Sequence, residues 1–147
     1  CGLDLVALGG PRRPPVRPIH SPIMNEAPSY GSDFSRGMRI DFDDRAVIYL
    51  SGTASIDAEG LVAHAGDIER QTDRMLANVE SLLAQQHAGL RHVVSAVTYL
   101  KEKDDRPALV AALRRRGFPE AVPHTICHAP ICRPDWLCEM ELVAILT

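Results

Sequence analysis

The sequence predicts a single α+β domain, with a mixed six-stranded sheet and two helices on one of its faces. Three observations lead to this fold class. The length of 147 residues suits one domain. The hydrophobic and charged fractions, 46% and 24%, are those of a globular protein and exclude a disordered or fibrous one. Strand-like and helix-like patterns follow the order β-ββ-α-β-α-ββ, which favours both helices packing on the same face.

The N-terminal part predicts one strand followed by an extended arm. Residues 2–8 form a mostly apolar run typical of a short, buried strand, which Gly9 and Gly10 end. Six prolines lie between residues 11 and 28; they remove amide donors and fix φ, so we expect this segment to lie outside regular structure. The arm also carries apolar side chains, which indicate that it packs on another surface: Val16, Ile19, Ile23 and Met24.

The next element is a hairpin. Residues 38–42 and 46–50 are strand-like and flank turn residues at 43–45. The second strand runs into the small residues 51–55. Such a run lets backbone amides approach a ligand closely, or it marks a β-bulge.

Two helices and three strands complete the pattern. Asp67 can cap a helix whose apolar positions recur at three- and four-residue spacing as far as Leu83. Residues 92–100 are rich in β-branched types and predict a strand, which a second helix follows up to Gly117. The last two strands are predicted as a hairpin with its turn at Arg133-Pro134-Asp135: residues 125–132 and 136–146.

Charge and cysteine content restrict the partners and the compartment. The net charge of −3 gives no basic excess for binding phosphates, so we expect no nucleic acid partner. No apolar run approaches the roughly 18 residues of a membrane span, and we recognise no signal peptide. The four cysteines therefore predict reduced thiols in a cytoplasmic protein. Cys1 stands first, either through methionine removal, truncation or proteolysis, or through self-cleavage that would make its thiol an N-terminal nucleophile.

The densest group of candidate ligands or catalytic side chains lies near the C-terminus. It comprises His124, Cys127, His128, Cys132, Cys138, Glu139 and Glu141. We expect no metal site, because His124, His128 and Cys132 are four residues apart along a predicted strand and would be separated by roughly 13 Å at about 3.3 Å per residue. Glu139 and Glu141 share one face of an otherwise apolar strand. Each is either exposed to water or a half-buried carboxyl with a raised pKa, suited to acid or base catalysis.

Motifs between residues 27 and 146 resemble those of the RidA/YjgF family. They are Ala27-Pro28 with Gly31, Phe34-Ser35-Arg36-Gly37, Ser51-Gly52-Thr53, Gln71 with Leu76-Ala77-Asn78-Val79, Val97-Thr98-Tyr99-Leu100-Lys101, and Glu139-Met140-Glu141. The resemblance implies a chorismate-mutase-like fold and a trimer, or pseudo-trimer, with ligand sites between subunits. It also implies hydrolysis of reactive enamines and imines without a cofactor. It divides the chain into an N-terminal strand and proline-rich arm, residues 1–26, and the family domain, residues 27–147.

Two positions depart from the deaminating members of that family. Those members carry a carboxylate-binding arginine fifteen residues before the glutamate of the last strand, where this chain has His124. Histidine is mostly neutral near pH 7 and lacks the bidentate fork of arginine. Phe34 stands where those members usually have tyrosine. These departures separate the chain from the ordinary imine deaminases.

A second resemblance is to the C-terminal half of chorismatases, which hydrolyse the enol-ether side chain of chorismate to pyruvate and a cyclic acid. It rests on residues 27–36, 51–56, 64–71 and 132–139. In that family a cysteine and a glutamate seven residues apart matter to the outcome of the reaction with chorismate. Cys132 and Glu139 have that spacing. Chorismatases are much longer, so either a separate chain supplies the other half or this chain stands alone with another substrate.

Together the resemblances predict acid/base hydrolysis of an enol-ether, enamine or imine substrate that carries a carboxylate, in an intersubunit cleft. Glu139 is the expected acid or base, with Cys132 shaping the pocket or moving a proton. The substrate-binding candidates are His124, Phe34, Arg36, Thr53 and Ala54. The alternative is a non-catalytic subunit that either binds a small carboxylate or has a structural role. Such a subunit could be one half of a cleaved two-chain enzyme. The expected partners are the small carboxylate and either two further copies or a second chain, with no membrane.

Overall fold

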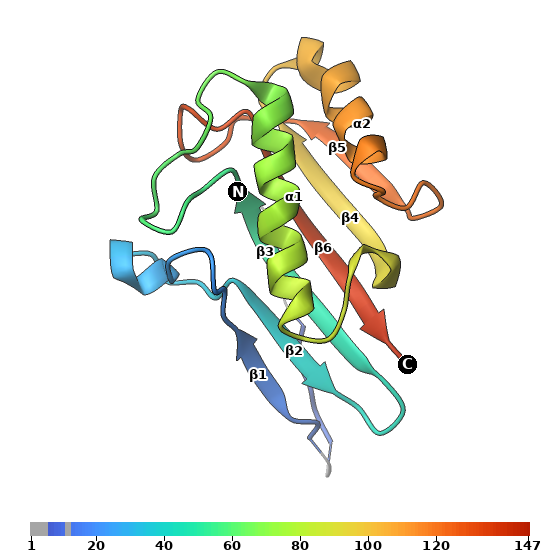
Figure 1. Ribbon diagram of the computed structural model, residues 1–147. Helices are drawn as coiled ribbons and strands as arrows, with labels where there is room; N and C mark the ends of the chain where they lie inside the picture. Colours follow the sequence, from blue (N-terminus) through green and yellow to red (C-terminus); the bar gives the residue numbers. More distant parts are fainter. Residues whose placement is uncertain (1–5, 11–12) are drawn as a thin grey trace.

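The computed structural model describes residues 6–10 and 13–147. In this part of the chain six strands form one sheet, and two helices cover one of its faces (Figure 1). The predicted fold class is therefore confirmed. The elements are β1 (Val16–Ile19), β2 (Gly37–Asp41), β3 (Ala46–Ala54), α1 (Ile68–Ala84), β4 (Val93–Leu100), α2 (Arg106–Arg115), β5 (His124–His128) and β6 (Cys138–Leu146).

The strand order is β1-β2-β3-β6-β4-β5, with β4 and β5 parallel and the other described neighbours antiparallel. The predicted final hairpin is wrong, because β6 inserts between β3 and β4 while β5 lies at the edge. β5 ends at His128, two residues before Pro130, which lacks the amide donor that a strand needs. β6 has nine residues and an apolar buried face, and a central place satisfies both of its backbone edges.

The N-terminal segment also differs from the prediction. Residues 6–8 are irregular rather than a strand, and residues 2–5 lie outside the described part. A strand occurs instead inside the proline arm, where β1 pairs with β2 at the edge of the sheet. Pro18 is tolerated there because an edge strand has one side without ladder partners. The arm packs on the domain as predicted, with Ile19 and Met24 buried in the core.

The main core lies between α1 and the sheet. Asp67 caps α1 as predicted, its carboxylate accepting from the Arg70 backbone N–H at 3.0 Å. Large apolar side chains of α1 are completely buried against β3 and β6: Met75, Leu76, Val79, Leu82 and Leu83. Each contributes about 1.5–3 kcal/mol relative to exposure, so this layer holds the helix to the sheet.

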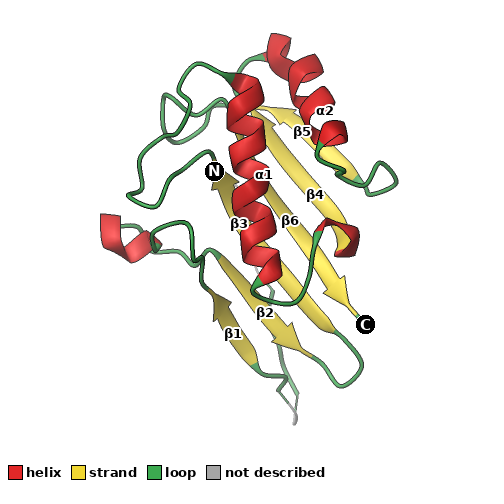
Figure 2. Ribbon diagram, viewed as in Figure 1, coloured by secondary structure: helices red, strands yellow, loops and turns green. Residues whose placement is uncertain are grey.

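Two loops meet at the end of the sheet where β6 begins (Figure 2). One is the loop at 55–67, between β3 and α1; the other is the loop at 129–137, between β5 and β6. Arg133 of the second loop donates from Nη1 to the Gly60 carbonyl of the first at 2.6 Å. Trp136 donates from Nε1 to the Ser55 carbonyl at 3.2 Å. These bonds bring distant parts of the sequence together around the start of β6.

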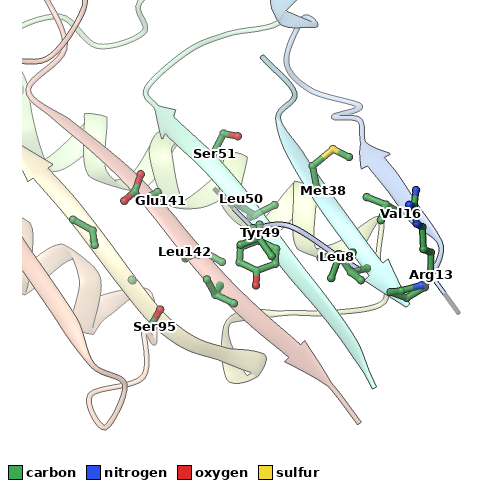
Figure 3. A pocket seen from close by; sticks show the side chains of 16 residues that line it. Leu8, Arg13, Val16, Met38, Tyr49, Leu50, Ser51, Ser95, Glu141 and Leu142 are labelled. Atoms are coloured by element: carbon green, nitrogen blue, oxygen red, sulfur yellow. The ribbon is translucent and has the colours of Figure 1, made fainter. Parts of the chain in front are cut away.

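The opposite face of the sheet carries a cavity of about 820 Å³ (Figure 3). Strand side chains such as Tyr49, Val143 and Glu141 form its floor. Leu8 and Arg13 of the N-terminal segment line it as well. In the described part of the chain, no helix has the length and apolar character that crossing a bilayer would require.

Candidate functional site

The Glu139 carboxyl lies directly over Gly52. Opposite Glu139, the register between β3 and β6 shifts between Leu50 and Thr53, so the small residues mark an irregularity in the ladder. A Cβ added to Gly52 would lie 2.0 Å from Glu139 Oε1 and 3.0 Å from its Cδ. Only glycine therefore leaves room for the carboxyl in this position.

A cavity of about 330 Å³ opens beside this carboxyl, within the range of small-ligand sites. Three stretches of chain meet there: the loop before β2, the end of β3 with the residues after it, and the loop that leads into β6. The lining residues are Ser32, Phe34, Arg36, Gly52, Ala54, Ile56, Cys132, Arg133, Trp136 and Glu139. Among the described residues, the lining thus combines aromatic and small apolar surface with one carboxyl, one thiol and two guanidinium groups.

Most of the residues that the sequence singled out meet at this cavity. Five of them line it: Phe34, Arg36, Ala54, Cys132 and Glu139. Thr53 does not line it; its side chain is buried, and its hydroxyl donates to the Ser51 carbonyl at 2.9 Å. Cys1 lies outside the described residues.

His124 lies away from this cavity within one chain. It pairs in register with Ala96, whose side chain belongs to the core on the helix-covered face. Its Nε2 is 2.8 Å from the Thr98 hydroxyl, and its ring centroid is 5.1 Å from that of Phe118. Burial lowers the pKa of His124 and so favours the neutral form of the ring. In this position it cannot bind a carboxylate in the chain's own cavity.

The pKa of Glu139 is raised above its ordinary value, mainly by burial and further by the Glu141 carboxylate. Glu141 lies on the same face of β6 and accepts a hydrogen bond from the Tyr99 hydroxyl at 3.1 Å. Glu139 is therefore easier to protonate than an exposed glutamate. A raised pKa makes such a carboxyl better suited than an exposed one to donate a proton and take it back.

Cys132 lies next to the carboxyl and at the solvent edge of the cavity. Partial burial and the Glu139 charge raise the pKa of its thiol, and the Arg133 charge offsets part of this increase. Because the thiolate is the nucleophilic form, a raised pKa disfavours covalent catalysis by Cys132. The environment suits a neutral thiol that forms part of the wall and donates a weak hydrogen bond.

Buried amide side chains of α1 hold the walls of the cavity in place. Gln71 donates to the His64 and Asp135 carbonyls at 3.2 and 2.8 Å and accepts from the Leu137 N–H at 2.9 Å. Asn78 donates to the carbonyls of two residues at the end of β3 and beyond it, Ala54 and Ile56, both at 3.0 Å. α1 thereby fixes both the end of β3 and the loop that precedes Glu139.

Arg133 and Trp136 line the cavity but were not among the candidates from the sequence. A signal was present, since both lie within the 132–139 motif that joins Cys132 to Glu139. The local pattern did not indicate where a loop side chain would point. Among the described residues, no group of three or more His, Cys, Asp or Glu side chains is arranged to hold a metal ion.

Comparisons with known proteins agree with this geometry. The model of a family described as endoribonuclease L-PSP matches residues 24–146. The 3-aminoacrylate deaminase RutC of Acinetobacter baylyi is 29% identical over 99 residues, which are 67% of this chain and 78% of that protein. An L-PSP-type structure from Entamoeba histolytica superposes with a TM-score of 0.75 at 19% identity, over 90% of this chain and all of that one. A chorismatase structure superposes with a TM-score of 0.80 at 21% identity, over 92% of this chain and 44% of the chorismatase.

Proposed function

Because the chain belongs to the endoribonuclease L-PSP family, also called the RidA/YjgF family, we propose that it hydrolyses a small enamine or imine that carries a carboxylate. The observation that carries this proposal is the half-buried Glu139 carboxyl, which has a raised pKa and lies over Gly52 in the wall of a small cavity. The name of the Acinetobacter baylyi relative supports the substrate class, since 3-aminoacrylate is an enamine with a carboxylate.

The reaction needs one group that gives and takes a proton. Glu139 protonates the carbon of the enamine, and the C=C–N unit becomes an iminium ion. The Glu139 carboxylate then removes a proton from water as the water oxygen bonds to the iminium carbon. The proton passes to nitrogen, and the C–N bond breaks as the new hydroxyl group gives its proton back to the Glu139 carboxylate. A carbonyl acid and ammonia leave, and Glu139 is protonated again. A raised pKa suits both steps, because the acid form that donates the proton then persists to higher pH than in an exposed glutamate, and its conjugate base is stronger.

A second candidate is hydrolysis of an enol ether. The observation that favours it is that Cys132 and Glu139, seven residues apart, line the same cavity. Protonation of the terminal alkene carbon by Glu139 would give an oxocarbenium ion, water would add to it, and the hemiketal would release a ketone and an alcohol. The chorismatase superposition supports the shared fold and covers less than half of that enzyme, so this candidate depends on the cavity rather than on the comparison.

We also propose that further copies of the chain, in a trimer, or a second chain cover the sheet face opposite the helices. The cavity of about 820 Å³ on this face is lined largely by apolar side chains, such as Val16, Met38 and Val143. A surface of this kind is typical of an interface between subunits. Light scattering at micromolar concentration should give a mass above that of the 16.1 kDa chain, and a monomer would contradict the assembly.

Turnover assays separate the candidate functions. The protein is incubated with 2-aminoacrylate, generated from serine by a pyridoxal-phosphate dehydratase, and separately with chorismate. Ammonia release faster than the spontaneous rate supports the proposed deaminase, and pyruvate release from chorismate supports the enol-ether candidate. Binding of a small carboxylate with neither reaction supports the non-catalytic alternative.

A further inference from the structure

Of the described residues, two arginines line the cavity beside Glu139, and the contacts that hold them differ. Arg36 is 3% exposed. It donates from Nε and Nη2 to the Asn25 carbonyl at 3.1 and 2.7 Å, and from Nη2 to Asn25 Oδ1 at 3.3 Å. These bonds fasten the segment before β2 to the domain. Arg36 is therefore mainly a structural residue of the wall.

Arg133 is half-buried, and its position in the cavity wall is set by the loop at 129–137. Its Nη1 donates to the Gly60 carbonyl at 2.6 Å, and its ζ carbon lies 4.9 Å from the centroid of the Trp136 ring. The hydrogen bond and the aromatic contact fix the orientation of the guanidinium plane. An arginine side chain carries five N–H donors in one plane. A guanidinium fixed in this way presents a planar fork that matches a carboxylate.

We infer that Arg133 binds the carboxylate of the substrate and so orients the reacting carbon towards Glu139. The inference rests on the proposed function and adds a specificity-determining residue to it. Arg133 and Glu139 line the same cavity of about 330 Å³, which suits a small acid that contacts both groups. His124 cannot take this role in the same chain, because it lies on the helix-covered side of the sheet.

The charges of the cavity agree with an anionic ligand. Among the described lining residues, Glu139 is the one carboxyl group, and Arg36 and Arg133 are the two basic groups. The thiol of Cys132 is influenced by both charged groups. The Glu139 charge raises the pKa of the thiol, and the Arg133 charge lowers it. Cys132, Arg133 and Glu139 all line this cavity, so the thiol forms part of the wall beside both groups.

The tryptophan beneath Arg133 allows binding to be measured without turnover. The chain contains one Trp, so its indole N–H gives one side-chain NMR signal that reports on this cavity. The ligand probes are pyruvate and its uncharged amide, pyruvamide. Pyruvate should shift the indole signal saturably, and pyruvamide should bind at least about tenfold more weakly, because charged hydrogen bonds are lost.

Substitution of Arg133 completes the test. Arg133→Gln should weaken pyruvate binding about 10- to 100-fold, and Arg133→Lys should keep part of the affinity, since it keeps the charge and loses the fork. Arg114→Gln is the matched control, because Arg114 is exposed on α2 and pairs with Glu120. Wild-type affinity in Arg133→Gln, equal binding of pyruvate and pyruvamide, or no pyruvate binding by the wild type would each overturn the inference.

Kinetics distinguish failure of this inference from failure of the proposed function. With 2-aminoacrylate, Arg133→Gln should raise KM by the same factor as it weakens pyruvate binding. Wild-type KM in Arg133→Gln, with turnover that depends on Glu139, would overturn the role of Arg133 and leave the deaminase proposal standing. Pyruvate binding that depends on Arg133, without any turnover, would overturn the deaminase and support Arg133 as a carboxylate-binding residue. The comparison of the two ligands on the wild type remains decisive even if Arg133→Gln does not fold.

Discussion

Replacing Gly52 with alanine places a methyl group where the Glu139 carboxyl lies. The added Cβ would lie 2.0 Å from Oε1, 3.0 Å from Cδ and 3.4 Å from Cγ of Glu139. Favourable contacts between carbon atoms lie at about 3.5–4.0 Å, so the carboxyl must move by about 1 Å or more. Gly52 does not have a positive φ, so alanine fits the backbone and the clash falls on a flexible side chain.

The displacement predicts a large effect on activity and a small one on stability. Misplacing a catalytic group by about 1 Å can cost about 100-fold in rate, so we expect turnover by Gly52→Ala to fall by about that factor. Alanine reduces the entropy of the unfolded chain, which favours folding by about 0.4–1 kcal/mol and opposes the cost of moving the carboxyl. The free energy of unfolding should therefore change by less than about 1 kcal/mol.

Ammonia release and urea unfolding measure the two effects. Gly89→Ala is the matched control, because a Cβ added to Gly89 would lie 3.9 Å from Arg91 Nη1, its nearest contact beyond the adjacent residues. In Glu139→Gln the same Gly52→Ala change should cost little further activity, since the carboxyl that it displaces is already inactive. Full activity in Gly52→Ala, or an equal loss with and without Glu139, would refute the reasoning.

Three further predictions concern the carboxyl, the scaffold and a buried thiol. Because burial raises the pKa of Glu139, the stability that its protonated form gives is present below the ordinary value of 4.5 and is lost as pH rises through the raised pKa. Glu139→Gln should thus raise Tm more at pH 8 than at pH 4, and an equal shift at both would contradict this. Gln71→Ala leaves three backbone groups without their buried partner, including the Leu137 N–H, and should lower the free energy of unfolding by about 2–4 kcal/mol in urea; a loss below about 0.5 kcal/mol would be inconsistent with these bonds. Burial raises the pKa of Cys138 to about 12, so a thiol reagent should modify it only after unfolding, as peptide mapping would detect; rapid labelling of the native protein would show that the thiol is accessible.

The sequence predicted what local periodicity determines. The Asp67 cap, the apolar face of α1 and the shared face of Glu139 and Glu141 all follow from spacing along one element, and the structure has each of them. The alternation along β6 was enough to indicate that Glu139 faces away from the core. These features need no knowledge of which strands pair.

Strand pairing could not be predicted in the same way, because it depends on competition for backbone partners across the whole sheet. The last two strands are neighbours in sequence, yet β6 pairs with β3 and β4. Proline content suggested an irregular arm, but an edge position accommodates Pro18 inside β1. The donors that proline lacks matter only where a neighbouring strand would use them.

In the candidate site, too, spacing along one strand could be predicted from the sequence, whereas contacts between distant segments could not. Counting fifteen residues back from Glu139 reaches His124, but the loop at 129–137 separates the two strands and the count does not determine which face His124 occupies. Arg133 and Trp136 enter the site through contacts with Gly60 and Ser55, which lie more than seventy positions earlier. Such contacts are set by packing and have no local signature.

The most direct measurement of the central claim is turnover by Glu139→Gln on the substrate that the wild type hydrolyses. The amide keeps the shape of the side chain and removes its exchangeable acid, so the rate should fall roughly 10²–10⁴-fold while the fold is retained. Glu141→Gln, on the same face of β6, is the comparison and should lose less than about tenfold, since it changes only a neighbouring charge. A Glu139→Gln protein that folds and turns over substrate at the wild-type rate would contradict the account.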